Sequence, residues 1–202
     1  KFEEAQALLA RADQMRRRNL PPEHADQRDT AFGSAVLARL SGNAGGARQR
    51  LQKLIASSPE QDPRRGEYVY ELGRSSLALG QWDEAHEQLT AAAEVLPRSV
   101  GGVHPLAIHA QALAAYADWR RGGSPEAANL RLADAYVQFD QLGLASLDEA
   151  AEILLMRSAL AAVLGNNADA INLRASGIER YQILGIPPPA WIDWGASEVR
   201  RE

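Results

Sequence analysis

Apolar residues recur along this chain at the spacing of helix faces, in stretches that are interrupted by glycine and proline. The interruptions include Pro21-Pro22, Gly101-Gly102 and Gly122-Gly123, and Pro125 suits the first turn of a helix. The pattern predicts helices and no sheet, with the helices at about 3–18, 27–41, 44–57, 66–79, 82–96, 106–121, 125–142, 147–164 and 168–184.

Four glycine–alanine pairs mark an internal repeat. In each pair the alanine lies five residues after the glycine and opens an apolar helical stretch. The pairs are Gly42 with Ala47, Gly80 with Ala85, Gly123 with Ala128, and Gly165 with Ala170. Successive alanines are 38, 43 and 42 residues apart, a period typical of stacked helix pairs. We therefore predict one solenoid over residues 1–186.

Residues 67–97 carry the most specific motif. It consists of Leu72-Gly73, a turn at Gly80, then Ala85, Leu89 and Pro97. This order closely resembles the tetratricopeptide (TPR) pattern. The resemblance implies an all-α, right-handed superhelical solenoid of antiparallel helix pairs. We expect Gly73 and Ala85 where the paired helices approach closely, and Pro97 at the end of the second helix.

The loops around His24 and His104 precede first helices and are 80 residues, about two periods, apart. Val103-His104-Pro105 and its flanks resemble the Gly-x-x-His-Pro loop of the longer, kinesin-light-chain-type TPR repeats. We expect both histidines to order their loops. Such arrays are common in bacterial serine/threonine kinases and signalling regulators, so the resemblance implies a regulatory setting.

The chain also begins in the middle of a repeat. Phe2 to Ala5 has the spacing of Trp82 to Ala85, and Ala5 lies 42 residues before Ala47. We interpret the first helix as the second half of a truncated repeat, which gives about four and a half repeats cut from a longer protein.

Composition narrows the function classes. Hydrophobic residues make up 46% and charged residues 24% of the chain, as in soluble helical proteins. No apolar run is long enough for membrane insertion, and the net charge of −4 argues against nucleic acid as a partner. The absence of cysteine excludes disulfides and thiolate chemistry. Arginine and alanine dominate over lysine, which suggests a bacterium with a GC-rich genome.

The sequence offers no catalytic site. No two of the histidines have the i, i+4 spacing of metal ligands on one helix face, and no glycine-rich loop has the Lys-Ser/Thr of a phosphate-binding loop. We therefore predict no catalytic residue, no metal and no cofactor, and hence no enzyme in this chain. This prediction does not extend to a missing domain of the parent protein, which could be a kinase.

First helices line the concave face of TPR arrays, and the register fixed by Gly80 selects the side chains that point into it. The candidate peptide-binding residues are Phe32, Arg39, Tyr70, Glu71, Arg74, Leu113 and Met156. They predict a groove that is polar and partly cationic at first and apolar later, suited to a protein or peptide ligand with an acidic group and an apolar anchor. The alternative is that these side chains pack against neighbouring helices or face water. The paired Asn and Lys positions of co-chaperone carboxylate clamps are absent.

Residues 187–202 depart from the repeat. Pro187-Pro188-Pro189 cannot continue a helix, and Trp191 and Trp194 follow. We expect this tail to cap the last helix pair, since an array needs its final apolar face covered. The alternative is an exposed partner-binding motif.

The function predicted from the sequence is a non-catalytic protein- or peptide-binding scaffold module of a larger bacterial protein. The alternative is a ligand-sensing, regulatory domain of a membrane-anchored serine/threonine kinase or transcriptional regulator. The residues encoded before Lys1 would distinguish the two.

Overall fold

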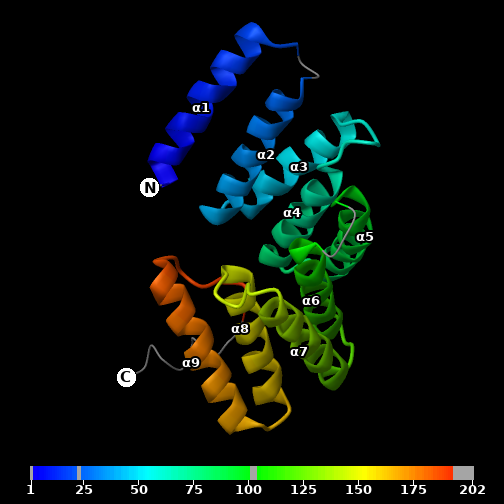
Figure 1. Ribbon diagram of the computed structural model, residues 1–202, viewed down its shortest axis with the longest axis vertical. Coiled ribbons are helices and arrows are strands. Elements are labelled where there is room, and N and C mark those ends of the chain that lie inside the picture. Colours follow the sequence, from blue (N-terminus) through cyan, green and yellow to red (C-terminus); the bar gives the residue numbers. More distant parts are fainter. Residues whose placement is uncertain (1, 22–23, 101–103, 193–202) are drawn as a thin grey trace. The chain divides into compact units, whose positions relative to one another are not determined.

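The computed structural model describes residues 2–21, 24–100 and 104–192, with the backbone alone for residues 97–100 (Figure 1). These residues form helices and no strand. The helices are α1 Phe2–Asn19, α2 Ala25–Leu40, α3 Ala44–Ser57, α4 Arg65–Ala78, α5 Trp82–Val100, α6 Pro105–Arg120, α7 Pro125–Gln141, α8 Asp148–Val163 and α9 Asn167–Leu184. All predicted bounds are confirmed to within two residues except the end of α5.

Helix α5 corrects the prediction for Pro97. The helix runs four residues beyond the predicted end, to Val100, so Pro97 does not end it. A proline lacks one backbone N–H and therefore removes a single helical hydrogen bond. The three residues after Pro97 continue the helix despite that loss.

Glycines with positive φ angles form the turns between paired helices. Gly42, Gly80 and Gly165 have φ angles of 87°, 70° and 78°, a left-handed conformation that glycine adopts without steric cost. In the turn between α6 and α7 this conformation falls on Gly122, with φ of 110°, and not on Gly123 as the repeat register predicts. Here two residues, Gly123 and the N-cap Ser124, stand between the turn glycine and α7, one more than in the other turns.

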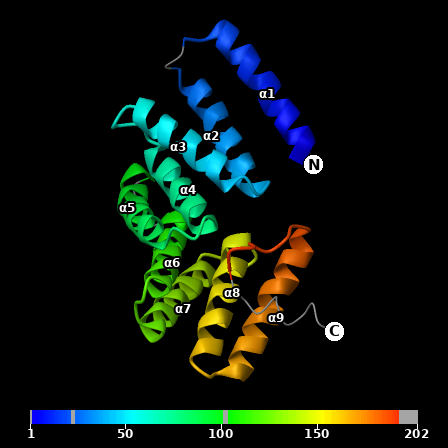
Figure 2. The same cartoon turned by 180° about the vertical axis from the view of Figure 1, so that it is seen from behind.

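The contacts divide the chain into two compact units, Lys1–Ser99 and Val100–Glu202, and each is described by itself. The extent of a single solenoid over residues 1–186 stays a prediction. In the first unit α1 packs on α2, α2 on α3 and α3 on α4, and α2 also contacts α4. Figure 2 shows the same succession of α1 to α4 from behind.

Gly73 lies at a close approach of α4 to α5. A Cβ atom added at Gly73 would stand 2.6 Å from Cγ of Leu89, which is fully buried. The close approach predicted at Gly73 is therefore confirmed. Its nearest atoms belong to Leu89, one turn beyond the predicted partner Ala85.

In the second unit α6, α7, α8 and α9 pack in chain order, and α6 also contacts α8. The core contains a buried ionisable pair: His109 Nε2 of α6 lies 3.4 Å from Glu152 Oε2 of α8, and neither side chain has solvent exposure. The ring of Phe139 in α7 meets the imidazole edge to face, with 6.3 Å between the ring centroids. The imidazole and the carboxylate are thus enclosed by α6, α7 and α8.

The two histidine loops share one structural role. His24 and His104 are the N-caps of α2 and α6, and each Nδ1 accepts a hydrogen bond from the backbone N–H two residues on, at 3.2 and 3.1 Å. Each imidazole satisfies a backbone donor that the first helical turn leaves unpaired. Both histidines are therefore helix N-caps, and their role in ordering the loops stays a prediction because residues 22–23 and 101–103 lie outside the described residues.

The C-terminal tail folds back on its unit over its described part. The Trp191 ring meets Tyr116 of α6 edge to face, with 5.6 Å between the ring centroids, and Ile192 is 2% exposed. Packing on the final helix pair stays a prediction, and Trp194 lies outside the described residues.

The burial of Ile192 predicts that the tail stabilises the unit. Ile192→Ala should lower the free energy of unfolding by about 2 kcal/mol or more, because it leaves a cavity at a buried site. Ile183→Ala is the control, since Ile183 is 78% exposed. Thermal denaturation followed by circular dichroism measures both, and equal melting temperatures for the two variants would favour an exposed binding motif.

Candidate functional site

Five of the seven predicted groove residues lie in the first unit. Four of these five contact one another, one on α2 and three on α4. Arg39 Nε of α2 donates to Glu71 Oε2 of α4 at 2.7 Å. Arg74 Nη1 lies 3.7 Å from Glu71 Oε1, and the Arg74 guanidinium stands over the Tyr70 ring at 5.6 Å from its centroid. We call Arg39, Tyr70, Glu71 and Arg74 the α2–α4 cluster.

Phe32 lies further along the same face of α2. Its ring meets Tyr68 at 5.2 Å between centroids, and the Arg64 guanidinium stands 4.8 Å above it. Arg64 also binds Asp29 of α2 at 2.6 Å and Glu67 at 2.7 Å. The hydrogen bond to Glu67, which favours the charged guanidinium, raises the pKa of Arg64 above its usual value.

The cluster is held firmly and exposes little surface. The side chains of Arg39 and Arg74 are each 11% exposed and that of Glu71 is 8% exposed. Their ion pairs also connect α2 to α4, which is the packing role that the sequence left open as the alternative. Both guanidiniums share the carboxylate of Glu71, which holds the two arginines close together.

The two remaining candidates lie in the second unit. Leu113 of α6 and Met156 of α8 have no solvent exposure, so both contribute to the core there. Helices α6 and α8 are buried on most of their surface, from Ala107 to Ala117 and from Ala150 to Ala161 with few exceptions. An apolar anchor for a ligand near these residues stays a prediction.

Sequence reasoning missed a cavity in the first unit, an open trough of about 610 Å³ between α1, α2 and α3. Its lining from α2 includes Gln27, Ala31, Ser34 and Ala38. Small and polar residues at this three- and four-residue spacing make one shallow helix face, and this spacing is the signal that points to the trough.

The described residues hold neither a metal-binding group of side chains nor a membrane-spanning helix. Within residues 2–21, 24–100 and 104–192, no three histidine or acidic side chains are grouped so as to hold a metal ion. None of the described helices is long and apolar enough to cross a bilayer. The arrangement provides charged side chains and hydrogen bonds between helices.

Comparisons with known proteins identify the fold. No protein-family model matches the chain, and no curated protein matches it. Two crystal structures of nearly identical TPR-like repeats of kinesin-light-chain type from Podosopora anserina are similar to it, one of them carrying a single substitution. The substituted structure has a TM-score of 0.62 at 19% identity and covers 91% of this chain and 88% of its own. The other has a TM-score of 0.60 at 18% identity and covers 100% of this chain and 90% of its own. The chain therefore has the all-α, TPR-like repeat fold that the sequence predicts.

Proposed function

We propose that the chain is a non-catalytic scaffold module that binds a protein or peptide through the α2–α4 cluster. The observation that carries the proposal is that Arg39 of α2 meets Glu71 and Arg74 of α4 where the two helices pack together. A TPR-like fold supports this kind of role, because its stacked helices present extended surfaces for partners.

The cluster suits a ligand with an acidic group. The guanidinium is planar and always charged, and its geometry matches that of a carboxylate, so Arg39 and Arg74 favour a ligand with an acidic group over one with a basic group. Tyr70 fixes the plane of the Arg74 guanidinium by stacking, which reduces the conformational entropy lost on binding. Charge-assisted hydrogen bonds in a nearly buried setting are stronger than those at an open surface.

Substitution of Arg74 tests the proposal. Peptides selected from a random displayed library on the whole chain would be titrated by calorimetry. For peptides that bind the α2–α4 cluster, Arg74→Ala should weaken binding by about 1 to 3 kcal/mol, or roughly 5- to 150-fold, and Arg74→Glu should abolish it. The reason is the loss, and then the reversal, of the charge that meets the ligand carboxylate.

Arg131→Glu provides the matched control, because Arg131 is exposed on α7 and the charge change is the same. Circular dichroism would verify that every variant is folded. If every selected peptide bound the parent and both Arg74 variants with equal affinity, the α2–α4 cluster would be removed from the function.

We further propose that this binding serves a larger bacterial signalling protein. The support is the resemblance to repeats of such proteins and the arginine- and alanine-rich composition. Sequencing of the gene upstream of the codon for Lys1 tests it, since a kinase domain or a winged helix with a membrane span would be legible there.

A further inference from the structure

The trough between α1, α2 and α3 lies on the side of α2 away from the α2–α4 cluster. Ala31, Ser34 and Ala38 of α2 line the trough, whereas Phe32 and Arg39 face α4. At 3.6 residues per turn, these two sets lie on faces of α2 that are about 120° apart. The trough is therefore a separate surface from the predicted groove.

The wall formed by α1 is fixed to α2 at two places. Arg16 donates to the backbone oxygen of Asp26 at 2.6 Å and to the hydroxyl of Thr30. Further along, a Cβ added at Gly33 would stand 3.3 Å from Cδ2 of Leu9, so Gly33 allows α1 to lie close. The opposite wall is fixed by Arg50 of α3, whose Nη1 donates to the backbone oxygen of Ser34 at 2.9 Å.

The lining has an apolar and a charged component. Leu9, Ala31, Leu37, Ala38 and Leu54 provide apolar surface along the three helices. The charged residues of the lining are Arg17, Arg28, Arg50, Lys53 and Asp13, which sum to +3 in a chain whose net charge is −4. The trough thus has the opposite sign to the molecule as a whole.

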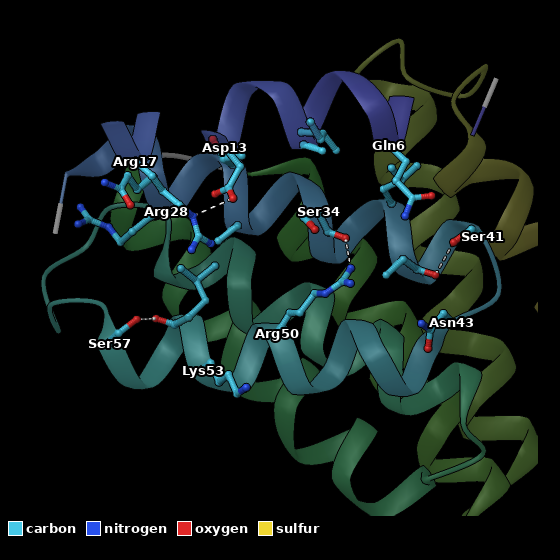
Figure 3. A pocket seen from close by; sticks show the side chains of 18 of the residues that line it. Gln6, Asp13, Arg17, Arg28, Ser34, Ser41, Asn43, Arg50, Lys53 and Ser57 are labelled. Carbon is cyan, nitrogen blue, oxygen red and sulfur yellow. Dashed lines mark hydrogen bonds and ion pairs between the residues drawn. The ribbon is translucent and has the colours of Figure 1, made fainter. Parts of the chain in front are cut away.

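The positive charges differ in how they are paired. Arg17 binds Asp13 at 2.8 Å, and Arg28 binds the buried Asp62 at 2.7 Å. In the described part of the chain no carboxylate pairs with Arg50 or Lys53, which lie three residues apart on α3 and are exposed. Figure 3 shows both side chains on α3, below α2.

The positive charges are also spread along the trough. In Figure 3, Arg17 and Arg28 lie toward one end, and the uncharged Gln6, Ser41 and Asn43 lie toward the other. The Arg50 guanidinium is bound to the backbone of Ser34, which lies six residues after Arg28 on α2. At a rise of 1.5 Å per residue, Ser34 and Arg28 are about 9 Å apart along the helix axis. Cations at this spacing suit several separate carboxylates better than they suit one compact anion.

We propose that this trough binds an acidic peptide segment of a partner protein. Carboxylates of the segment pair with Arg50 and Lys53, and an apolar side chain of the segment lies on Leu9 and Leu54. Charge complementarity selects this occupant, because the lining carries +3 and its two unpaired cations stand beside apolar surface. The inference shares with the proposed function the premise of peptide binding, but it concerns a different surface.

The test uses a displayed library of random twelve-residue peptides, in which about half of the peptides carry a net negative charge. Peptides that bind the whole chain are selected from this library. Selected peptides should combine Asp or Glu with Leu, Ile or Phe. The double variant Arg50→Glu/Lys53→Glu should weaken their binding by about tenfold or more, measured by fluorescence anisotropy. Arg74→Glu should leave these peptides bound, which distinguishes them from ligands of the α2–α4 cluster.

The double variant Arg11→Glu/Arg18→Glu is the matched control. Both arginines are exposed on α1 and outside the trough lining, and the change in net charge is the same. Equal losses of affinity in the two double variants would overturn the proposal, since net charge alone would then explain binding. A selection that yields no acidic peptides would overturn it as well.

A third variant blocks the trough without changing any charge. It is needed because Arg50 also holds α3 to α2, so its substitution alone could alter the fold. Ala31→Trp should fill the trough from the exposed face of α2 and weaken peptide binding by about tenfold. Ala56→Trp, at an exposed position of α3 outside the lining, should not. Unchanged affinity for Ala31→Trp would contradict the proposed site.

Discussion

Gly73→Leu is expected to lower the free energy of unfolding by about 3 kcal/mol, at the upper end of the costs of overpacking a core. Even the first added atom, Cβ, would stand 2.6 Å from Cγ of Leu89 and 3.4 Å from its backbone nitrogen. Leu89 is fully buried and its Cγ is not a free chain end, so α5 must move away from α4 to relieve the clash.

Gly45→Leu is the control for helix propensity, because a Cβ at Gly45 meets no atom within 4 Å and leucine favours a helix over glycine. Chemical denaturation with urea, followed by circular dichroism, gives both free energies. The prediction requires opposite signs for the two substitutions. A Gly73→Leu variant as stable as the parent would contradict the close packing of α4 on α5.

The period of glycine, alanine and proline was sufficient to predict the helices. Ala47, Ala85 and Ala128 are at most 4% exposed, in agreement with a repeated small-residue contact between paired helices. The errors arose where one residue changes the local geometry. The repeat register selects Gly123, which lies five positions before Ala128. The loop before α7 has one extra residue, so the left-handed conformation falls on Gly122, and the sequence alone does not distinguish the two glycines.

From the sequence, the candidate residues could be assigned to helix faces but not to their contacts. The charge of Arg39, Glu71 and Arg74 indicates only that these residues need partners if they are buried, and the ion pairs depend on how α2 packs on α4. Leu113 carries no such signal, because α6 is apolar on most of its surface and its exposure depends on which helices cover it. The trough was missed for a related reason, since it exists only when three helices are assembled.

The buried pair of the second unit gives the other large expected effect. Glu152→Met removes the carboxylate 3.4 Å from the His109 imidazole, at a site where neither side chain reaches solvent. Loss of one partner of a buried ionisable pair leaves the other partner desolvated and without that compensation, at a cost of about 3 to 5 kcal/mol. His109→Leu should cost a similar amount for the same reason.

The double variant His109→Leu/Glu152→Met separates the ion pair from packing. Both new side chains are apolar and close in volume to those they replace, so the variant leaves neither polar group of the pair in the core. Its stability should exceed that of either single variant, and denaturation by urea across the four proteins gives the coupling energy. Additive losses would mean that His109 and Glu152 stabilise the fold through contacts other than with each other, and the pair would then have no energetic role in joining α6 to α8.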